Sequence, residues 1–183
     1  MNREQWLIAA ADKLSAVVFS SEIVPANIRY SCGWPGGGSK NSRIGECWYP
    51  GASADASHEI FISPTIADAV RVLDILAHEM IHAICGPEAG HKGPFKRVAL
   101  KIGLTGKMTA TTAGPELLET LESIASDLGE YPHAEMSTSG KKKQTTRMIK
   151  AECACGYTIR LSRTWAQLVG ATCPDHGDMP IDL

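Results

Sequence analysis

No apolar run in this sequence approaches the roughly 20 residues that a helix needs to cross a bilayer. The N-terminus also lacks the basic lead of a secretory signal, because the short apolar stretch from Trp6 to Ala11 runs directly into Asp12 and Lys13. We therefore expect a cytoplasmic protein with no membrane partner. With 183 residues, 44% of them hydrophobic, the chain suits one globular domain of ordinary size and a small appendage.

The net charge of −2 is small, but it hides an asymmetry. Residues 1–136 contain 11 Lys and Arg against 16 Asp and Glu, whereas residues 137–183 contain 7 against 4. The seven basic residues of this tail end at Arg163 and have only Glu152 among them as an acid. The tail is therefore the part of the chain that we expect to approach a polyanion.

The stretch that organises the chain is Leu76–Ala83, which contains His-Glu-x-x-His within an apolar run of helical period. Residues four apart project from one face of a helix, so His78 and His82 can offer their imidazoles to a single metal ion. Glu79 lies one step round the helix, where it can reach a water on the open side of that ion. The motif predicts two nitrogen ligands and a carboxylate base for zinc-dependent hydrolysis.

A five-residue motif also arises by chance, and two histidines on a helix can simply be packed. The surrounding sequence favours the metal. Ser63-Pro64 predicts the start of the helix and Gly86-Pro87 its end. Apolar residues form a broad stripe between these limits, namely Ile66, Ala69, Val70, Leu73, Ala77, Met80, Ile81 and Ile84. Imidazoles and a carboxylate in such a buried helix are costly unless a partner such as a metal satisfies them.

A third protein ligand is needed, and His91 is the nearest candidate. It follows the Gly86-Pro87 break and Gly90, so a chain that turns at these glycines can bring His91 back over the site. Glu116 or Glu119 is a weaker candidate and Glu88 the weakest. The His-x-x-Gly-x-x-His spacing of metzincins is absent.

The remaining pattern predicts an α+β domain. Helices are expected over 2–19, over 95–102 and after Gly114-Pro115, with strands over 28–32, 44–49 and 59–63 and a loop or short extended piece over 106–111. Three short strands before a His-Glu helix are typical of a zincin-like metallopeptidase domain, whose edge strand commonly holds an extended peptide. We place this domain at 1–130 and a polar linker, which includes His133, at 131–146.

Residues 147–183 carry a second pattern of metal ligands. Cys153 and Cys155 form one close pair, and Cys173 and His176 form another after 17 intervening residues. Two such pairs separated by the length of a hairpin predict a zinc ribbon. A segment this short buries too little to fold alone, so a structural zinc explains it better than scattered thiols in a disordered tail. The apolar cluster of Trp165, Leu168 and Val169 also argues for order.

Taken together, these features resemble the SprT-like family of zinc metallopeptidases, in particular its short members from phages and bacteria. The resemblance rests on Ile75–Ala83, on Ala89–Phe95 and on the terminal ribbon, in this order along nearly the full chain. It implies that His78, His82 and His91 hold the catalytic zinc and that Glu79 is the base. It also implies a protease that acts on DNA-associated proteins in the cytoplasm, which is the host cytoplasm if a phage encodes the chain.

The sequence departs from the family pattern at two positions. Lys92 stands between His91 and Gly93 in the family's Gly-His-Gly-x-x-Phe segment, which leaves the ligand in place but changes the turn. His176 stands where the family often has cysteine. We therefore expect two Zn²⁺ ions, one catalytic and one structural, held by the residues named above.

The expected activity is hydrolysis of peptide bonds in a protein substrate, with Glu79 taking the proton of the attacking water. Tyr30, Tyr49 and His58 are available to stabilise the oxyanion, and no pattern selects among them; His58 is expected to face solvent beside a strand. The alternative is a non-catalytic DNA- or partner-binding protein with structural zinc sites, although such a protein has no chemical need for Glu79. Hydrolysis of a cell-wall peptide is a weaker third possibility.

The tail also contains candidate contacts to single-stranded or double-stranded DNA. The basic candidates are Lys141, Lys142, Lys143, Arg147, Lys150, Arg160 and Arg163. Tyr157 and Trp165 are available to stack on unpaired bases. The competing interpretation is that the three lysines are merely solvated and that Trp165 packs inside the ribbon.

Overall fold

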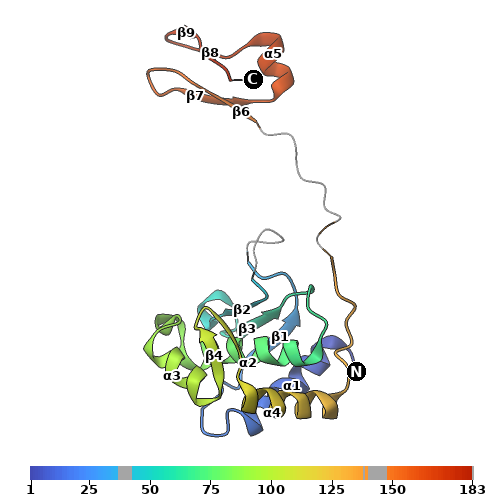
Figure 1. The fold of residues 1–183 in the computed structure, drawn as a ribbon. Helices are drawn as coiled ribbons and strands as arrows, with labels where there is room; N and C mark the ends of the chain where they lie inside the picture. The colour runs from blue at the N-terminus through green and yellow to red at the C-terminus, as the bar shows by residue number, and fades with distance from the viewer. Residues whose placement is uncertain (37–42, 138, 140–147, 183) are drawn as a thin grey trace. The chain divides into compact units, whose positions relative to one another are not determined.

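The structure, a computed structural model, describes residues 1–36, 43–137, 139 and 148–182. It divides the chain into two units, residues 1–138 and residues 139–183, and each is described by itself (Figure 1). Among the described residues, no helix has both the length and the apolar character that a membrane crossing requires.

A three-stranded sheet of the first unit carries the order β1-β3-β2. Its strands are β1 (Ile28–Cys32), β2 (Gly45–Trp48) and β3 (His58–Ile62). The central strand pairs in parallel with β1 and antiparallel with β2, and it turns Ile60 and Ile62 into the core, where both are fully buried. The three predicted strands are thus confirmed. The sheet also shows that β2 is an edge strand, and that it lies against the helix of the His-Glu motif.

The motif helix α2 (Ala69–Cys85) starts five residues later than the Ser63-Pro64 pattern predicts. Its N-cap is Asp68, whose side chain accepts the backbone N–H of Arg71 at 2.7 Å. The hydroxyl of Ser63 instead lies 3.0 Å from that of Thr65 within the preceding turn. A carboxylate at the positive end of the helix dipole is a stronger cap than a hydroxyl already used in a turn. The predicted end is right, since Gly86 follows with φ of 77°.

Three further helices surround α2: α1 (Arg3–Val17), α3 (Gly93–Lys101) and α4 (Pro115–Leu128). They share one core, whose fully buried side chains include Trp6, Leu14, Leu76, Phe95 and Leu121. Helix α2 packs against β2 and β3 as well as against α3 and α4 (Figure 1). The motif helix is therefore held by contacts on several sides, which fixes the direction of its side chains.

A β-hairpin lies where the sequence predicted a loop or a short extended piece over 106–111. Strand β4 (Leu104–Lys107) pairs antiparallel with β5 (Ala110–Ala113), and Thr105 lies opposite Thr112. Its sequence is rich in threonine and poor in large apolar residues, so alternation of hydrophobicity does not reveal it. The hairpin packs against α2, and this contact matters for the site below.

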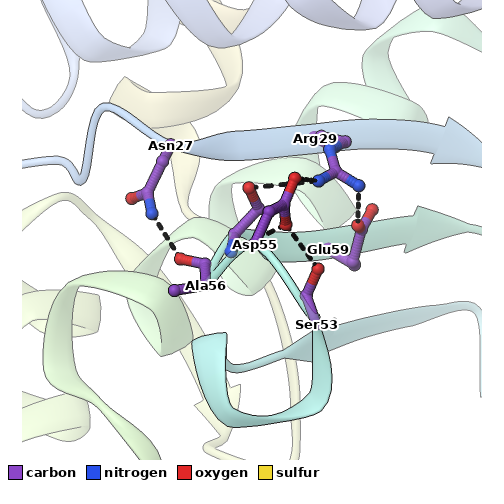
Figure 2. A network of polar contacts seen from close by, with 7 residues as sticks. Asn27, Arg29, Ser53, Asp55, Ala56 and Glu59 are labelled. Carbon is purple, nitrogen blue, oxygen red and sulfur yellow. Dashed lines mark hydrogen bonds and ion pairs between the residues drawn. The ribbon is translucent and has the colours of Figure 1, made fainter.

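A polar network ties the connection between β2 and β3 to the far strand β1 (Figure 2). This connection contains the 3₁₀ turn η2 (Pro50–Ala52). Arg29 of β1 contacts Asp55 and donates to Glu59 at 2.7 Å, while Ser53 donates to Asp55 at 2.7 Å. The hydroxyl of Ser53 and the Arg29 guanidinium hold the pKa of the Asp55 carboxyl well below its ordinary value. Arg29 and Asp55 are exposed, so we expect the network to position the loop more than to stabilise the fold.

Part of the predicted linker lies against the first unit. Tyr131 is 4% exposed and contacts Trp6 edge to face, with ring centroids 5.1 Å apart. His133 donates from Nε2 to the Pro64 carbonyl at 2.8 Å, and the same carbonyl accepts the backbone N–H of Met136 at 2.8 Å. His133 is therefore an anchoring residue and not free linker, a contact that links positions 69 residues apart and that local sequence cannot reveal.

The second unit contains two small hairpins and one short helix. Strand β6 (Ile149–Glu152) pairs with β7 (Thr158–Leu161), helix α5 (Arg163–Val169) follows, and β8 (Thr172–Cys173) pairs with β9 (Gly177–Asp178). Its buried core consists of four residues, Ala151, Ala171, Cys173 and Met179. Trp165, Leu168 and Val169 are 59%, 68% and 67% exposed, so these apolar side chains do not fill the interior of this unit. For Trp165 this disfavours the competing interpretation that it packs inside the ribbon.

Candidate metal centres

Three imidazoles from two segments of the first unit converge on one point. His78 and His82 project from α2, and His91 follows the 3₁₀ turn η3 (Pro87–Ala89) that the chain makes after that helix. Nε2 of His91 lies 3.2 Å from Nε2 of His82 and 3.4 Å from Nε2 of His78. In a tetrahedral site with zinc–nitrogen bonds of about 2.0–2.1 Å, two ligand nitrogens lie roughly 3.3 Å apart. The cluster can therefore hold a metal ion of zinc's size.

The surroundings keep these imidazoles neutral, which is the form that binds metal. Burial, followed by the nearby His82 and His91 rings, lowers the pKa of His78 to about 3. Burial and the His91 ring lower the pKa of His82 to about 4, and burial also lowers that of His91. At neutral pH the three nitrogens therefore present lone pairs to a cation.

Two contacts outside the ligand set fix the orientation of the rings. Phe95, at the start of α3 and fully buried, lies beside all three imidazoles, with centroid distances of 4.9 Å to His78, 4.6 Å to His82 and 5.0 Å to His91. Thr111 of β5 places its hydroxyl 2.7 Å from Nδ1 of His78. The sequence analysis named Phe95 as the end of the Ala89–Phe95 segment without giving it a role at the site, and it did not indicate Thr111. The histidines and Phe95 stand within one local segment, whereas Thr111 lies 33 residues beyond His78.

Glu79 is 7% exposed and lies where α2 meets the edge strand β2. Burial, with a further effect from Glu46, raises the pKa of Glu79 to about 8. The approach to β2 is close, because a Cβ atom added to Gly45 would lie 2.5 Å from Oε1 of Glu79 and 2.6 Å from Ile75. Gly45 is thus the residue whose missing side chain leaves room for this carboxylate, a requirement that its position in a short strand does not reveal.

A cleft of about 520 Å³ lies over the histidine cluster. The edge strand β2 and its flanks line one side, and Thr109–Thr112 of the hairpin line the other. Tyr49 lines this cleft together with Glu79 and the three histidines. Burial and the nearby Cys47 and Glu79 raise the pKa of Tyr49 to about 12, so its phenol carries a proton at neutral pH.

The other candidates of the sequence lie elsewhere. Tyr30 and His58 are absent from the described lining of the cleft, and His58 is 8% exposed, so the expectation that it faces solvent is wrong. His58 begins the central strand β3, beside the ring of Tyr49, and this position buries it. Glu116 and Glu119 line a different hollow, and Glu88 is exposed on η3.

The second unit brings its four predicted ligands together. Sγ of Cys173 lies 3.7 Å from Sγ of Cys155 and 3.6 Å from Nδ1 of His176, and one ligand atom from each of these residues and Cys153 falls within 4.8 Å of the others. With zinc–sulfur bonds of about 2.3 Å, tetrahedral geometry places two sulfurs roughly 3.8 Å apart and a sulfur and a nitrogen roughly 3.6 Å apart. Burial opposes ionisation of Cys173, but the His176 side chain and nearby backbone N–H groups outweigh it and lower its pKa to about 6. This cluster can hold a metal ion too.

The basic candidates divide into two groups. Lys141, Lys142, Lys143 and Arg147 lie outside the described residues. Lys150 and Arg160 lie opposite each other on the exposed face of the β6–β7 hairpin, and exposed Arg163 begins α5. Lys150 is also paired with Glu152, while Tyr157 is 42% exposed.

Comparison of the chain with protein-family models, with curated proteins and with solved structures gave no match. The function proposed below is therefore argued from the geometry of the two clusters.

Proposed function

We propose that this protein is a zinc-dependent metalloendopeptidase with a zincin-like, SprT-like catalytic unit and a structural zinc ribbon. The observation that carries the proposal is the set of three converging Nε2 atoms beside a buried glutamate in an open cleft. When bound there, zinc supplies a Lewis acid that makes a water acidic and polarises a peptide carbonyl. Three protein ligands with free space beside them are typical of a catalytic site.

Glu79 is the general base in this proposal. Its carboxylate accepts the proton of the attacking water and delivers it to the leaving amine. Burial raises the pKa of this carboxyl, which makes its carboxylate form a stronger base than an exposed one. Gly45 leaves the carboxylate the space it needs at the strand. Tyr49 is the oxyanion donor, because among Tyr30, Tyr49 and His58 it is the one that lines the cleft and it keeps its proton at neutral pH.

The edge strand β2 is the part that holds the substrate. One side of β2 pairs with β3, and no other strand of the described residues pairs with it. Residues of β2 line the cleft beside Glu79, so an extended peptide that pairs with its backbone lies across the metal cluster. Backbone pairing selects a peptide by its extended conformation and not by its side chains. This selectivity suits a protease that acts on loosely folded segments of proteins.

We further propose that the ribbon binds DNA and brings this activity to DNA-associated proteins. Exposed Lys150, Arg160 and Arg163 supply phosphate contacts, and exposed Trp165 supplies a stacking surface for an unpaired base. Binding should weaken steeply with salt. The double variant Lys150→Ala/Arg160→Ala should flatten the salt dependence of oligonucleotide binding by about 0.7 per lost contact for a single strand. Lys96→Ala/Arg97→Ala on α3 of the first unit is the matched control, and an equal effect of both pairs would refute the assignment to the ribbon.

The catalytic proposal is tested by casein cleavage with zinc-loaded protein, with and without single-stranded DNA. Wild-type protein should cleave, and Glu79→Gln should lose at least about 10³-fold in rate because no other group takes the proton. Glu119→Gln removes an exposed carboxylate from α4 and should cleave like wild type. Zinc bound at both clusters without cleavage under any condition would refute the peptidase and favour the non-catalytic DNA- or partner-binding protein.

A further inference from the structure

We propose that Thr111 is a positioning residue of the histidine cluster: its hydroxyl fixes the tautomer and the orientation of the His78 ring. The hydroxyl lies 2.7 Å from Nδ1 of His78, and Thr111 is 7% exposed. This polar contact lies at the ring nitrogen of His78 that does not face the convergent Nε2 atoms. The inference rests on the proposed metal site but not on peptidase activity.

The tautomer of His78 decides whether it can bind metal through Nε2. A neutral imidazole carries one proton, and the nitrogen that ligates must be the one without it. When the Thr111 oxygen accepts a hydrogen bond from Nδ1–H, the proton is held on Nδ1 and the lone pair stays on Nε2. Such an outer contact also restrains rotation of the ring, and its loss typically lowers metal affinity by about 10- to 100-fold.

The geometry of the hairpin places the Thr111 hydroxyl at the His78 ring. Along β5, Thr111 is buried, while its neighbours Ala110 and Thr112 are exposed, as strand alternation requires. A second contact joins the same strand to the preceding turn of α2. Burial raises the pKa of the Asp74 carboxyl, and the Arg71 guanidinium and the backbone N–H of Ala113 oppose that rise. Strand β5 therefore meets α2 at Asp74 and at His78, one helical turn apart on the same face.

This arrangement gives the hairpin a function. The β4–β5 pair contributes little to the large core, since Leu104 is the one residue of the two strands within the buried cluster. Its contribution is instead the contact of β5 with the ligand-bearing face of α2. A short hairpin attached at two points sets both the rotation of the helix and that of the ring, which is how an outer contact improves a metal site.

The test compares Thr111→Val with Thr111→Ser and Thr112→Val in the full chain. Valine keeps the shape and β-branching of threonine but cannot accept from Nδ1–H; serine keeps the hydroxyl; Thr112→Val makes the same change on the exposed face. Cobalt titration separates the two clusters, because only the ribbon gives a sulfur-to-cobalt charge-transfer band. That band should be unchanged in all variants and serves as the internal control.

We expect Thr111→Val to weaken cobalt and zinc binding at the histidine cluster by about 10- to 100-fold. Thr111→Ser should recover most of the affinity, and Thr112→Val should bind like wild type. ¹⁵N NMR of the zinc-free protein should show the proton of His78 on Nδ1 in wild type and a mixture of tautomers in Thr111→Val. Wild-type affinity in Thr111→Val, or equal losses in the valine and serine variants, would overturn the proposal while leaving the peptidase standing. Failure of wild-type protein to bind cobalt at the histidines would refute the proposed function, and this inference with it.

Discussion

The two metal clusters lie in units with very different amounts of core. The histidine cluster stands on a helix that packs against both strands and helices, within a core that draws on all four helices of the first unit. The Cys/His cluster stands in a unit whose core, among the described residues, consists of Ala151, Ala171, Cys173 and Met179, and Cys173 is itself a candidate ligand. In the first unit the fold positions the ligands, whereas in the second the ligands must hold the fold.

The two clusters also differ in the number and the type of their candidate ligands. Three histidines would leave the fourth position of a bound zinc free for a water or a substrate, whereas three cysteines and one histidine would complete its coordination. A free position is useful for chemistry and a filled one for stability. In the proposed function the first cluster is therefore catalytic and the second structural, and each of the following predictions tests one of these two roles.

The largest expected effect is on the ribbon. Cys173→Ala, or metal removal with a chelator, should unfold residues 148–182, because bound zinc supplies on the order of 10 kcal/mol to such small units. The first unit should keep its fold. Loss of dispersed amide signals from the tail alone, followed by NMR, checks this. Cys85→Ala, at the end of α2 and outside both clusters, is the matched control. A chelator-treated ribbon that remains folded would show that its small core suffices.

The next largest effect is expected at Tyr49, the proposed oxyanion donor of the first unit. Tyr49→Phe should lower kcat by about 10²-fold with little change in KM, since the lost hydrogen bond forms only as charge develops on the carbonyl oxygen. Zinc should stay at both clusters. Tyr30→Phe removes a second phenol whose pKa burial also raises, but which lies outside the described lining of the cleft. Equal kinetics for Tyr49→Phe and wild type would remove Tyr49 from the mechanism.

A smaller loss of cleavage activity is expected from a substitution in the edge strand β2. Gly45→Ala places a Cβ atom against Glu79 and Ile75, so we expect cleavage to fall about 10-fold through a displaced base while both metals remain bound. Gly51→Ala is the control, because its added Cβ meets nothing within 4 Å. Cleavage rates with metal content measured on the same samples decide the outcome. Full activity in Gly45→Ala would mean that the carboxylate acts from another position.

The smallest effect on stability is expected at Trp165. Because this side chain is 59% exposed, Trp165→Ala should change the thermal stability of the ribbon by less than about 0.5 kcal/mol. The same variant should weaken binding of a single-stranded oligonucleotide roughly 10-fold through lost stacking. Loss of ribbon structure in this variant would show that the metal does not hold the fold alone.

The sequence predicted what depends on local pattern. Helical period, glycine breaks and ligand spacing gave the His-Glu helix, the three strands and the segments that carry His91 and the ribbon ligands. The start of α2 was missed because two capping signals, Ser63 and Asp68, stand only five residues apart. Contacts between distant segments were not predictable: Thr111 meets His78 across 33 residues, and His133 meets Pro64 across 69.

The sequence also failed to predict whether certain side chains are buried or exposed. His58 was expected to face solvent but is buried, since a lone polar residue at a strand end carries no period. For Trp165 the sequence left stacking and packing open, and its 59% exposure favours the first. The edge position of β2 likewise required the strand order, which only the three-dimensional pairing supplies.

The most direct test of two distinct metal sites is the zinc content per chain. It is measured by elemental mass spectrometry for the wild-type protein and for His91→Ala. We predict two zinc ions in wild type and one in His91→Ala, with the remaining ion lost when Cys173→Ala is added. Two ions that persist in His91→Ala would contradict the three-histidine site, and a single ion in wild type that survives His91→Ala would show that the first cluster binds no zinc.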